Sequence, residues 1–370
     1  MRLIIHGGYY KTGTTAFQRW LHASRDRLSG MGIFVPDPGP NNNHGFALNA
    51  SIRAGREELA LWPELEAAAR RGHGFAIVSA ETIASYFARD FEVFHDRVRD
   101  YDPVLFMVLR HWQEYLPSKH AQDIRRGDWL TLPGFLSRLE RDHDRHPDAN
   151  FGLPFRRAHE AGFGSLLAVG YGGDVALDIV AELTGIAVSE LDGGQWPERR
   201  VNRRLDPLLT ERIRMLNAIA GPHGELFAGH AYDGALDPTL PTRFLLLTEV
   251  TRRLSIRHPE LIAKIDACIE AEEVAVSMAD YAGLFDRWRA DLRRTLSEAG
   301  VEDRLGAFEA PAEQETIRAS LAESDRLPAA LRERIYRHIV KIRGEVWNEL
   351  KERRSRDAGL AQGRTGAGTT

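Results

Sequence analysis

The sequence predicts an α/β protein, in which three layers form from a central parallel β-sheet flanked by helices, followed by a mainly helical C-terminal region. Two observations support this prediction. In the first half, short apolar runs alternate with stretches whose apolar residues recur at helical spacing, which is typical of a parallel sheet covered by helices. Past about residue 205 the strand-like runs stop and helical patterns continue.

The elements of the first half follow from apolar runs and turn formers. The first predicted helix comes directly after the first strand, and its core-facing stripe consists of Phe17, Trp20, Leu21 and Leu28. Residues 36–43 are dense in Pro, Gly and Asn and predict a loop. A later strand leads into a helix at residues 178–183. The predicted strands are residues 3–5, 33–35, 75–78, 104–109 and 166–169.

The second half predicts a helical cap or substrate-side region. We expect an α/β core over residues 1–215, a helical region over 216–354 and a disordered tail rich in Gly, Ala and Thr over 355–370. The predicted helices are residues 208–219, 242–254, 261–273, 281–299 and 331–352.

Composition limits the possible partners and compartments. The chain has 370 residues and a net charge of −4, so no overall positive charge favours binding to nucleic acid. Cys268 is the single cysteine, which rules out an intrachain disulfide and a thiolate metal cluster. No apolar run approaches the roughly 20 residues that cross a bilayer, and no signal peptide is expected at the N-terminus. We therefore expect a cytoplasmic protein; the helical half offers surfaces for a homodimer.

The most informative stretch is residues 6–15, His-Gly-Gly-Tyr-Tyr-Lys-Thr-Gly-Thr-Thr. A strand, a tight loop and a helix N-terminus together form a site for a phosphate-like anion, because backbone N–H groups and the helix dipole point at it. Lys11 adds a full positive charge. A Walker A loop places its lysine after the last glycine, whereas Lys11 precedes Gly13, so an ordinary ATP or GTP site is disfavoured.

A second candidate anion site follows the strand at 104–109. Arg110 ends that strand, where open α/β sheets bind ligands, and Ser118 follows eight residues later. The planar guanidinium fork suits a terminal phosphate, and a hydroxyl at the start of the following helix suits the same anion.

Together these segments resemble the PAPS-dependent sulfotransferases, which use 3′-phosphoadenosine 5′-phosphosulfate. Lys-Thr-Gly-Thr-Thr is similar to their 5′-phosphosulfate loop, and Arg110 with Ser118 is similar to their 3′-phosphate site. Residues 81–87, Glu-Thr-Ile-Ala-Ser-Tyr-Phe, resemble a stretch of the carbohydrate sulfotransferases, although Thr82 stands where those often have Lys. Residues 199–204, including Asn202, look like the basic segment that follows the last core strand in bacterial members. The resemblance covers roughly residues 1–215.

The resemblance implies a P-loop-like fold and transfer of a sulfuryl group from PAPS to a hydroxyl, more so of a carbohydrate or glycolipid than of a planar phenol. Lys11 would stabilise the departing phosphate. The general base would be Glu81 or His44, with Glu81 preferred. The implied PAPS-binding residues are Lys11, Thr12, Gly13, Thr14, Thr15, Arg110, Ser118 and Asn202.

One departure from the family pattern and two alternative functions stay open. Ala16 replaces the Trp that contacts adenine in small-molecule sulfotransferases, so adenine must stack elsewhere or not at all. A catalytically inactive relative that binds PAP (the desulfated product) or another anionic partner is one alternative, and a divergent nucleotide kinase is another. No metal is expected: His143 and His146 lie in a charged stretch typical of a solvated helix end.

Overall fold

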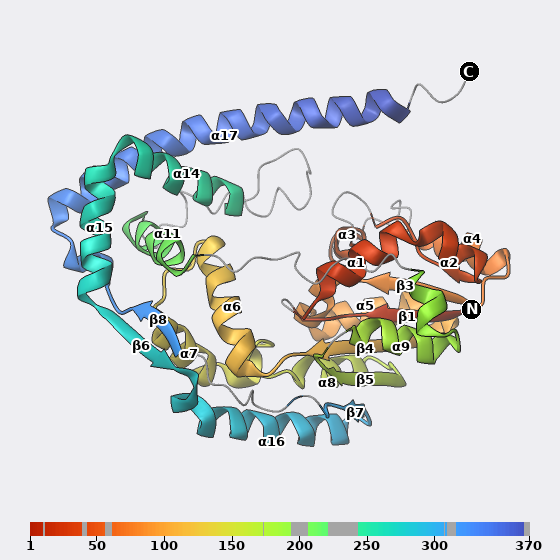
Figure 1. Ribbon diagram of the computed structural model, residues 1–370. Helices are drawn as coiled ribbons and strands as arrows, with labels where there is room; N and C mark the ends of the chain where they lie inside the picture. The colour runs from red at the N-terminus through yellow and green to blue at the C-terminus, as the bar shows by residue number, and fades with distance from the viewer. Residues whose placement is uncertain are drawn as a thin grey trace. The chain divides into compact units, whose positions relative to one another are not determined.

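The computed structural model describes residues 1–9, 12–38, 43–55, 61–172, 174–193, 206–220, 243–306, 308 and 316–365 (Figure 1). The chain divides into two compact units, each built from three separate segments. Unit 1 comprises Met1–Leu116, Arg138–Arg203 and Ala279–Gln314, and unit 2 comprises Pro117–Ser137, Arg204–Met278 and Glu315–Thr370.

Unit 1 contains a six-stranded sheet in which every neighbouring pair is parallel (Figure 1). Its strand order is β2-β3-β1-β4-β5-β7, so β1 and β4 lie side by side at the centre. The five strands predicted from apolar runs are confirmed. The sixth strand, β7, was not predicted. The strands are β1 (Arg2–His6), β2 (Ile33–Phe34), β3 (Phe75–Ser79), β4 (Pro103–Leu109), β5 (Ser165–Gly170) and β7 (Glu302–Arg304).

Helices cover both faces of this sheet. On one face, Ile4, Phe106 and Val169 pack against helices that follow β1 and β5. The residues between them in the strands, such as Ile5 and Leu105, point to the other face and are also fully buried. The predicted stripe of the first helix is buried, as expected, although the helix breaks at Ser24. The helices on the first face are α1 (Thr14–Ala23), α2 (Arg25–Gly30), α9 (Val175–Thr184) and α10 (Val188–Asp192).

Further helices complete unit 1, and two helices run across the division between the units. α6 (Trp112–Arg125) and α7 (Leu132–Arg141) are continuous and contribute residues to both units. The remaining helices of unit 1 include α3 (Gly45–Ala54), α4 (Leu61–Arg70), the 3-10 helix η1 (Glu81–Ser85), α5 (Ala88–Val98), α8 (Leu153–Glu160) and α16 (Ala282–Glu298).

Unit 2 is mainly helical, as predicted, and has its own apolar core, in which Leu254, Ile265, Ile335 and Ile339 are buried. Its helices include α11 (Pro207–Ala220), α14 (Arg243–Arg257), α15 (Pro259–Ala271) and α17 (Ala329–Thr365). An antiparallel pair, β6 (Glu273–Ser277) with β8 (Thr316–Ser320), was not predicted. In β6 the sequence Glu-Val-Ala-Val-Ser alternates between the two faces of a strand, and this alternation could have predicted it.

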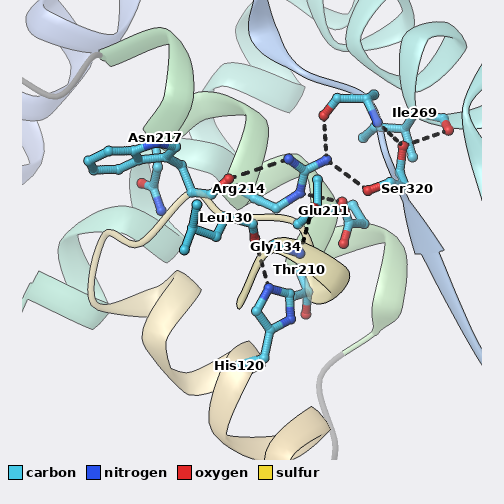
Figure 2. A network of polar contacts seen from close by, with 12 residues as sticks. His120, Leu130, Gly134, Thr210, Glu211, Arg214, Asn217, Ile269 and Ser320 are labelled. Atoms are coloured by element: carbon cyan, nitrogen blue, oxygen red, sulfur yellow. Dashed lines mark hydrogen bonds and ion pairs between the residues drawn. The ribbon is translucent and has the colours of Figure 1, made fainter. Parts of the chain in front are cut away.

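A buried arginine ties together several segments of unit 2 (Figure 2). Arg214 is 1% exposed; its Nε donates to Glu211 Oε2 at 2.6 Å, and its Nη2 donates to the carbonyl oxygen of Ala322 at 2.7 Å. Arg214 Nη2 also reaches the carbonyl oxygen of Ser320, whose hydroxyl donates to Ile269 O at 3.0 Å. The network thus connects α11, α15 and the end of β8.

The units differ from the predicted domain boundaries. Helix α11 continues past residue 215, and the segment 279–314 belongs to unit 1, because β7 pairs with β5 and α16 packs on α8. Helix α17 extends to Thr365, so the first part of the predicted disordered tail is helical. In the part of the chain that the structure describes, no helix combines the length and apolar character needed to span a bilayer.

Candidate functional site

The loop after β1 runs along the carboxyl end of β4. The amide of Gly7 donates to Phe106 O at 2.9 Å, and the amide of Tyr9 donates to Val108 O at 3.5 Å. Thr12 closes the loop because its hydroxyl donates to Tyr9 O at 2.6 Å. Lys11, the predicted catalytic lysine, lies outside the described residues. The loop therefore lies at the central carboxyl edge of the sheet, where ligands bind in open α/β folds.

The N-terminus of α1 opens from this loop. Gly13 is the N-cap residue, in the left-handed region with φ of 79°, which glycine adopts without strain. The amides of Ala16 and Phe17 donate to Gly13 O, at 3.0 and 3.3 Å. The amides of Thr14 and Thr15 come before these first bonds of the helix, and such N–H groups are available to an anion.

Gly8 is required by close packing beneath the loop. A Cβ atom there would lie 2.7 Å from Thr14 Cγ2 and 2.8 Å from His6 Nε2, closer than real contacts of this kind. Thr14 and His6 are each 1% exposed, so neither side chain has open space to move into. The loop backbone thus lies directly on the start of α1.

Glu81 meets the start of α1. β1 and β3 pair in register, with His6 opposite Ser79, and η1 begins at Glu81, two residues after β3 ends. The Thr14 hydroxyl donates to Glu81 Oε1. Two segments that the sequence analysis assigned separately, the Lys-Thr-Gly-Thr-Thr loop and the 81–87 stretch, are therefore in direct contact.

Arg110 lies at the end of β4, as predicted. Its Nε donates to Glu114 Oε2 at 2.8 Å, and its guanidinium carbon lies 5.1 Å from the ring centre of Tyr171. A Cβ atom on Gly13 would lie 3.6 Å from Cε2 of the same ring. Tyr171 therefore links the loop to Arg110, and the two predicted anion-binding elements are neighbours at one edge of the sheet.

Tyr171 was not identified from the sequence. It directly follows β5, at the carboxyl end of a parallel strand, just as Arg110 directly follows β4. The same rule that selected Arg110 would have found it. Ala16 offers no aromatic face, whereas the Tyr171 ring lies close to both of the predicted anion-binding elements.

Ser118 and Asn202 are the other two predicted nucleotide ligands. Ser118 lies in the second turn of α6, not at its start, since the helix begins at Trp112. It belongs to unit 2, whereas Arg110 belongs to unit 1. Asn202 lies outside the described residues.

His44, the alternative base, is 1% exposed and has both ring nitrogens engaged. Its Nδ1 accepts from the amide of Ser79 at 3.0 Å, and its Nε2 donates to Pro36 O at 3.2 Å. Burial lowers the pKa of His44 to about 4, against the hydrogen bonds to Pro36 and Ser79 that raise it. This imidazole is a neutral connector between α3 and β3.

His6 was missed by the sequence analysis as a structural residue of the site. Its Nδ1 lies 2.9 Å from Ser79 Oγ, and its ring packs between Phe17 and Phe106, with centroids at 4.8 and 4.9 Å. Burial lowers the pKa of His6 to about 3, so the ring is neutral. Its place under Gly8 makes it part of the floor of the loop.

No metal site emerges: among the described residues, no group of three or more His, Cys, Asp or Glu side chains could hold an ion. Comparisons with known proteins give no match, whether with protein-family models, curated proteins or solved structures.

Proposed function

We propose that this protein is a sulfotransferase that transfers a sulfuryl group from PAPS to an acceptor hydroxyl, on a P-loop-like core. The observation that carries the proposal is the contact of Glu81 with Thr14 at the N-terminus of α1. A helix N-terminus favours an anion, whereas a carboxylate beside it repels one. Such a carboxylate is useful when the bound anion is a donor group that a deprotonated hydroxyl attacks.

In the proposed mechanism, Glu81, the loop after β1 and the start of α1 have separate roles. PAPS, when bound, supplies an activated sulfuryl group, so its transfer needs in-line geometry and charge stabilisation. Glu81 takes the proton from the acceptor hydroxyl, whose oxygen then forms the new S–O bond. The amides of Thr14 and Thr15, together with Lys11, stabilise the charge left on the 5′-phosphate as the old S–O bond breaks. PAP and the sulfated acceptor then leave, and Glu81 releases the proton to solvent before the next turnover.

The nucleotide assignment depends on Arg110 and Tyr171. Arg110 provides guanidinium N–H donors beside the loop for a second phosphate, and the Tyr171 ring provides a face for a base. A ligand with phosphates at both sites is a 3′,5′-bisphosphorylated nucleotide. A nucleoside triphosphate carries all its phosphates on one side and would leave Arg110 unused.

Of the two candidates for the general base, Glu81 meets the geometric requirement better than His44. A general base must reach the proton that it abstracts. The Glu81 carboxylate contacts the loop residue Thr14, whereas both His44 nitrogens bond the backbone of residues 36 and 79.

Ligand-induced thermal shift tests the nucleotide assignment. PAP at a hundredfold excess over its Kd should stabilise the protein by about 2.7 kcal/mol, and ATP should do much less. Arg110→Ala and Lys11→Ala should remove the PAP shift. Arg71→Ala is the matched control, because Arg71 also lies over an aromatic ring, 5.7 Å from the centre of Phe34, but outside the site. Equal shifts with ATP and PAP would overturn the assignment.

Turnover with labelled PAPS tests the chemistry. Glu81→Gln should lower the transfer rate about 100-fold or more while the PAP shift persists, because it removes the base and keeps the size of the side chain. His44→Gln should keep most of the activity in a folded protein. A PAP shift without any transfer to hydroxyl acceptors by the unmodified chain would instead support the non-catalytic PAP-binding alternative, which the Thr82 departure favours.

A further inference from the structure

An exposed aromatic side chain lies close to two guanidinium groups in unit 1. Phe87 is 66% exposed and is the N-cap residue of α5. The guanidinium carbon of Arg53 lies 5.9 Å from the centre of its ring, and that of Arg157 lies 5.6 Å away. We call Phe87, Arg53 and Arg157 the Phe87 platform. An exposed apolar ring beside two cations can contact a ligand through its apolar surface and through the neighbouring positive charges.

The platform is held in place by its own hydrogen bonds. Asp90 Oδ2 accepts from the amide of Phe87 at 3.0 Å and from Arg53 Nη2 at 2.8 Å. Arg53 Nη2 also donates to Ser85 O at 3.1 Å, and Arg157 Nη1 donates to Tyr86 O at 2.8 Å. These bonds fix the backbone of residues 85–87 and both arginine side chains before any ligand arrives.

The two arginines differ in charge compensation. Arg53 pairs with Asp90 at 2.8 Å. Arg157 forms no ion pair with a carboxylate of the described chain, and its one described hydrogen bond goes to a backbone carbonyl. Burial lowers the pKa of Arg157, whereas the nearby Tyr9, Asp90 and Glu160 raise it. A guanidinium has five N–H donors, so Arg157 retains capacity for an anion.

The helices that carry the platform pack on the 3-10 helix that carries Glu81. Helix α3 carries Arg53 and α8 carries Arg157, and both helices pack on η1, which begins at Glu81, and on α5. Four residue steps of 3-10 helix and two of extended chain separate Glu81 from Phe87, which places their Cα atoms at most about 15 Å apart. An oligosaccharide is therefore long enough to contact both Glu81 and Phe87.

We propose that the Phe87 platform binds an acidic sugar of an oligosaccharide acceptor, with the sugar ring on Phe87 and its carboxylate on Arg157. This inference rests on the proposed sulfotransferase function, since it assigns the acceptor of that same site. The planar fork of arginine pairs with a carboxylate through two parallel hydrogen bonds. The Phe87 ring offers an apolar face to the C–H groups of a pyranose. The positive charge that the family resemblance leads one to expect at position 82 is supplied instead from α3 and α8.

Binding to a defined pair of oligosaccharides tests the proposal. The probes are a hexasaccharide of alternating uronic acid and N-acetylhexosamine, and the same hexasaccharide with its carboxyl groups reduced to alcohols. Titration calorimetry on the full chain should give a Kd about tenfold lower for the acidic probe. Arg157→Gln should raise the Kd for the acidic probe about tenfold and remove its preference over the reduced one. Phe87→Ala should raise the Kd for both probes about threefold. The matched control Arg71→Gln should bind as the unmodified chain does.

The PAP thermal shift, measured on the same samples, separates this proposal from the function on which it rests. A normal PAP shift with no preference for the acidic probe overturns the acidic acceptor and leaves the sulfotransferase proposal intact. Loss of probe binding in Arg71→Gln to the same extent as in Arg157→Gln also overturns it, because the effect would then reflect net charge. No PAP shift in the unmodified chain overturns the sulfotransferase proposal, and with it the assignment of any bound oligosaccharide as an acceptor. Unchanged circular dichroism and thermal midpoint of Arg157→Gln exclude misfolding as the cause.

Discussion

At the scale of a single residue, Gly8 controls the geometry of the loop that we propose binds the anion. Gly8→Ala should abolish the PAP thermal shift, because the new methyl group would displace Thr14 and with it the amides of α1. Overpacking of this kind should also lower the free energy of unfolding by about 1–3 kcal/mol.

Gly74→Ala is the matched control for that substitution. Gly74 directly precedes β3, and a Cβ atom there would meet nothing within 4 Å. This variant should keep the PAP shift and the unfolding free energy of the unmodified chain. A normal PAP response of Gly8→Ala would show that the loop does not hold the nucleotide phosphate.

At the scale of elements, two buried imidazoles connect β1, β3 and α3. His6 and His44 both contact Ser79, and burial lowers their pKa values to about 3 and about 4 from 6.5. Below pH 6.5 the unfolded chain binds protons that the folded chain excludes, so stability is highest above that pH and is lost as the pH falls. Between pH 7 and pH 5 each histidine should lower the free energy of unfolding by about 2 kcal/mol.

Hydrogen exchange of the β1 and β3 amides at pH 7 and pH 5, corrected for intrinsic rates, measures this loss. Replacing both histidines by Gln should flatten the pH dependence, although the starting stability is lower. Carboxylates with lowered pKa values, such as Glu249 at about 2, lose their contribution only below their usual pKa of 4.5. An unchanged pH dependence in the double variant would show that other groups cause it.

The elements also show what the sequence could predict. Five strands were predicted because each is an apolar run buried on both faces, whereas β7 (Glu-Asp-Arg) has no such run and is defined only by pairing with β5. The loop and Glu81 were assigned from local motifs. Their contact depends on the pairing of β1 with β3, which brings together residues far apart in the chain. The Phe87 platform needs three helices to meet, and no local pattern encodes that.

At the scale of the whole molecule, each unit has its own core and can be tested separately. Arg214→Met should destabilise unit 2 by about 3 kcal/mol, because it leaves the Glu211 carboxylate buried without its partner. The double variant Arg214→Met with Glu211→Leu should recover most of that loss. Hydrogen exchange of α11 and β8 measures both effects.

Arg212→Met is the matched control on the same helix. Its ion pair with Asp266 is more exposed, at 25% and 20%, so its loss should cost about 1 kcal/mol or less. Equal costs for Arg212→Met and Arg214→Met would show that the buried network adds nothing beyond an ordinary ion pair.

The position of β7 in the chain has a consequence for biosynthesis. β7 pairs with β5, yet it leaves the ribosome after residues 204–278, which belong to unit 2. During translation the edge of β5 therefore stays unpaired until residues 302–304 are made, and part of unit 2 is synthesised before them. An unpaired strand edge in a nascent chain can pair with other chains. Translation that pauses shortly before residue 302 would therefore produce a chain whose first five sheet strands are complete but whose sheet still has an open, aggregation-prone side.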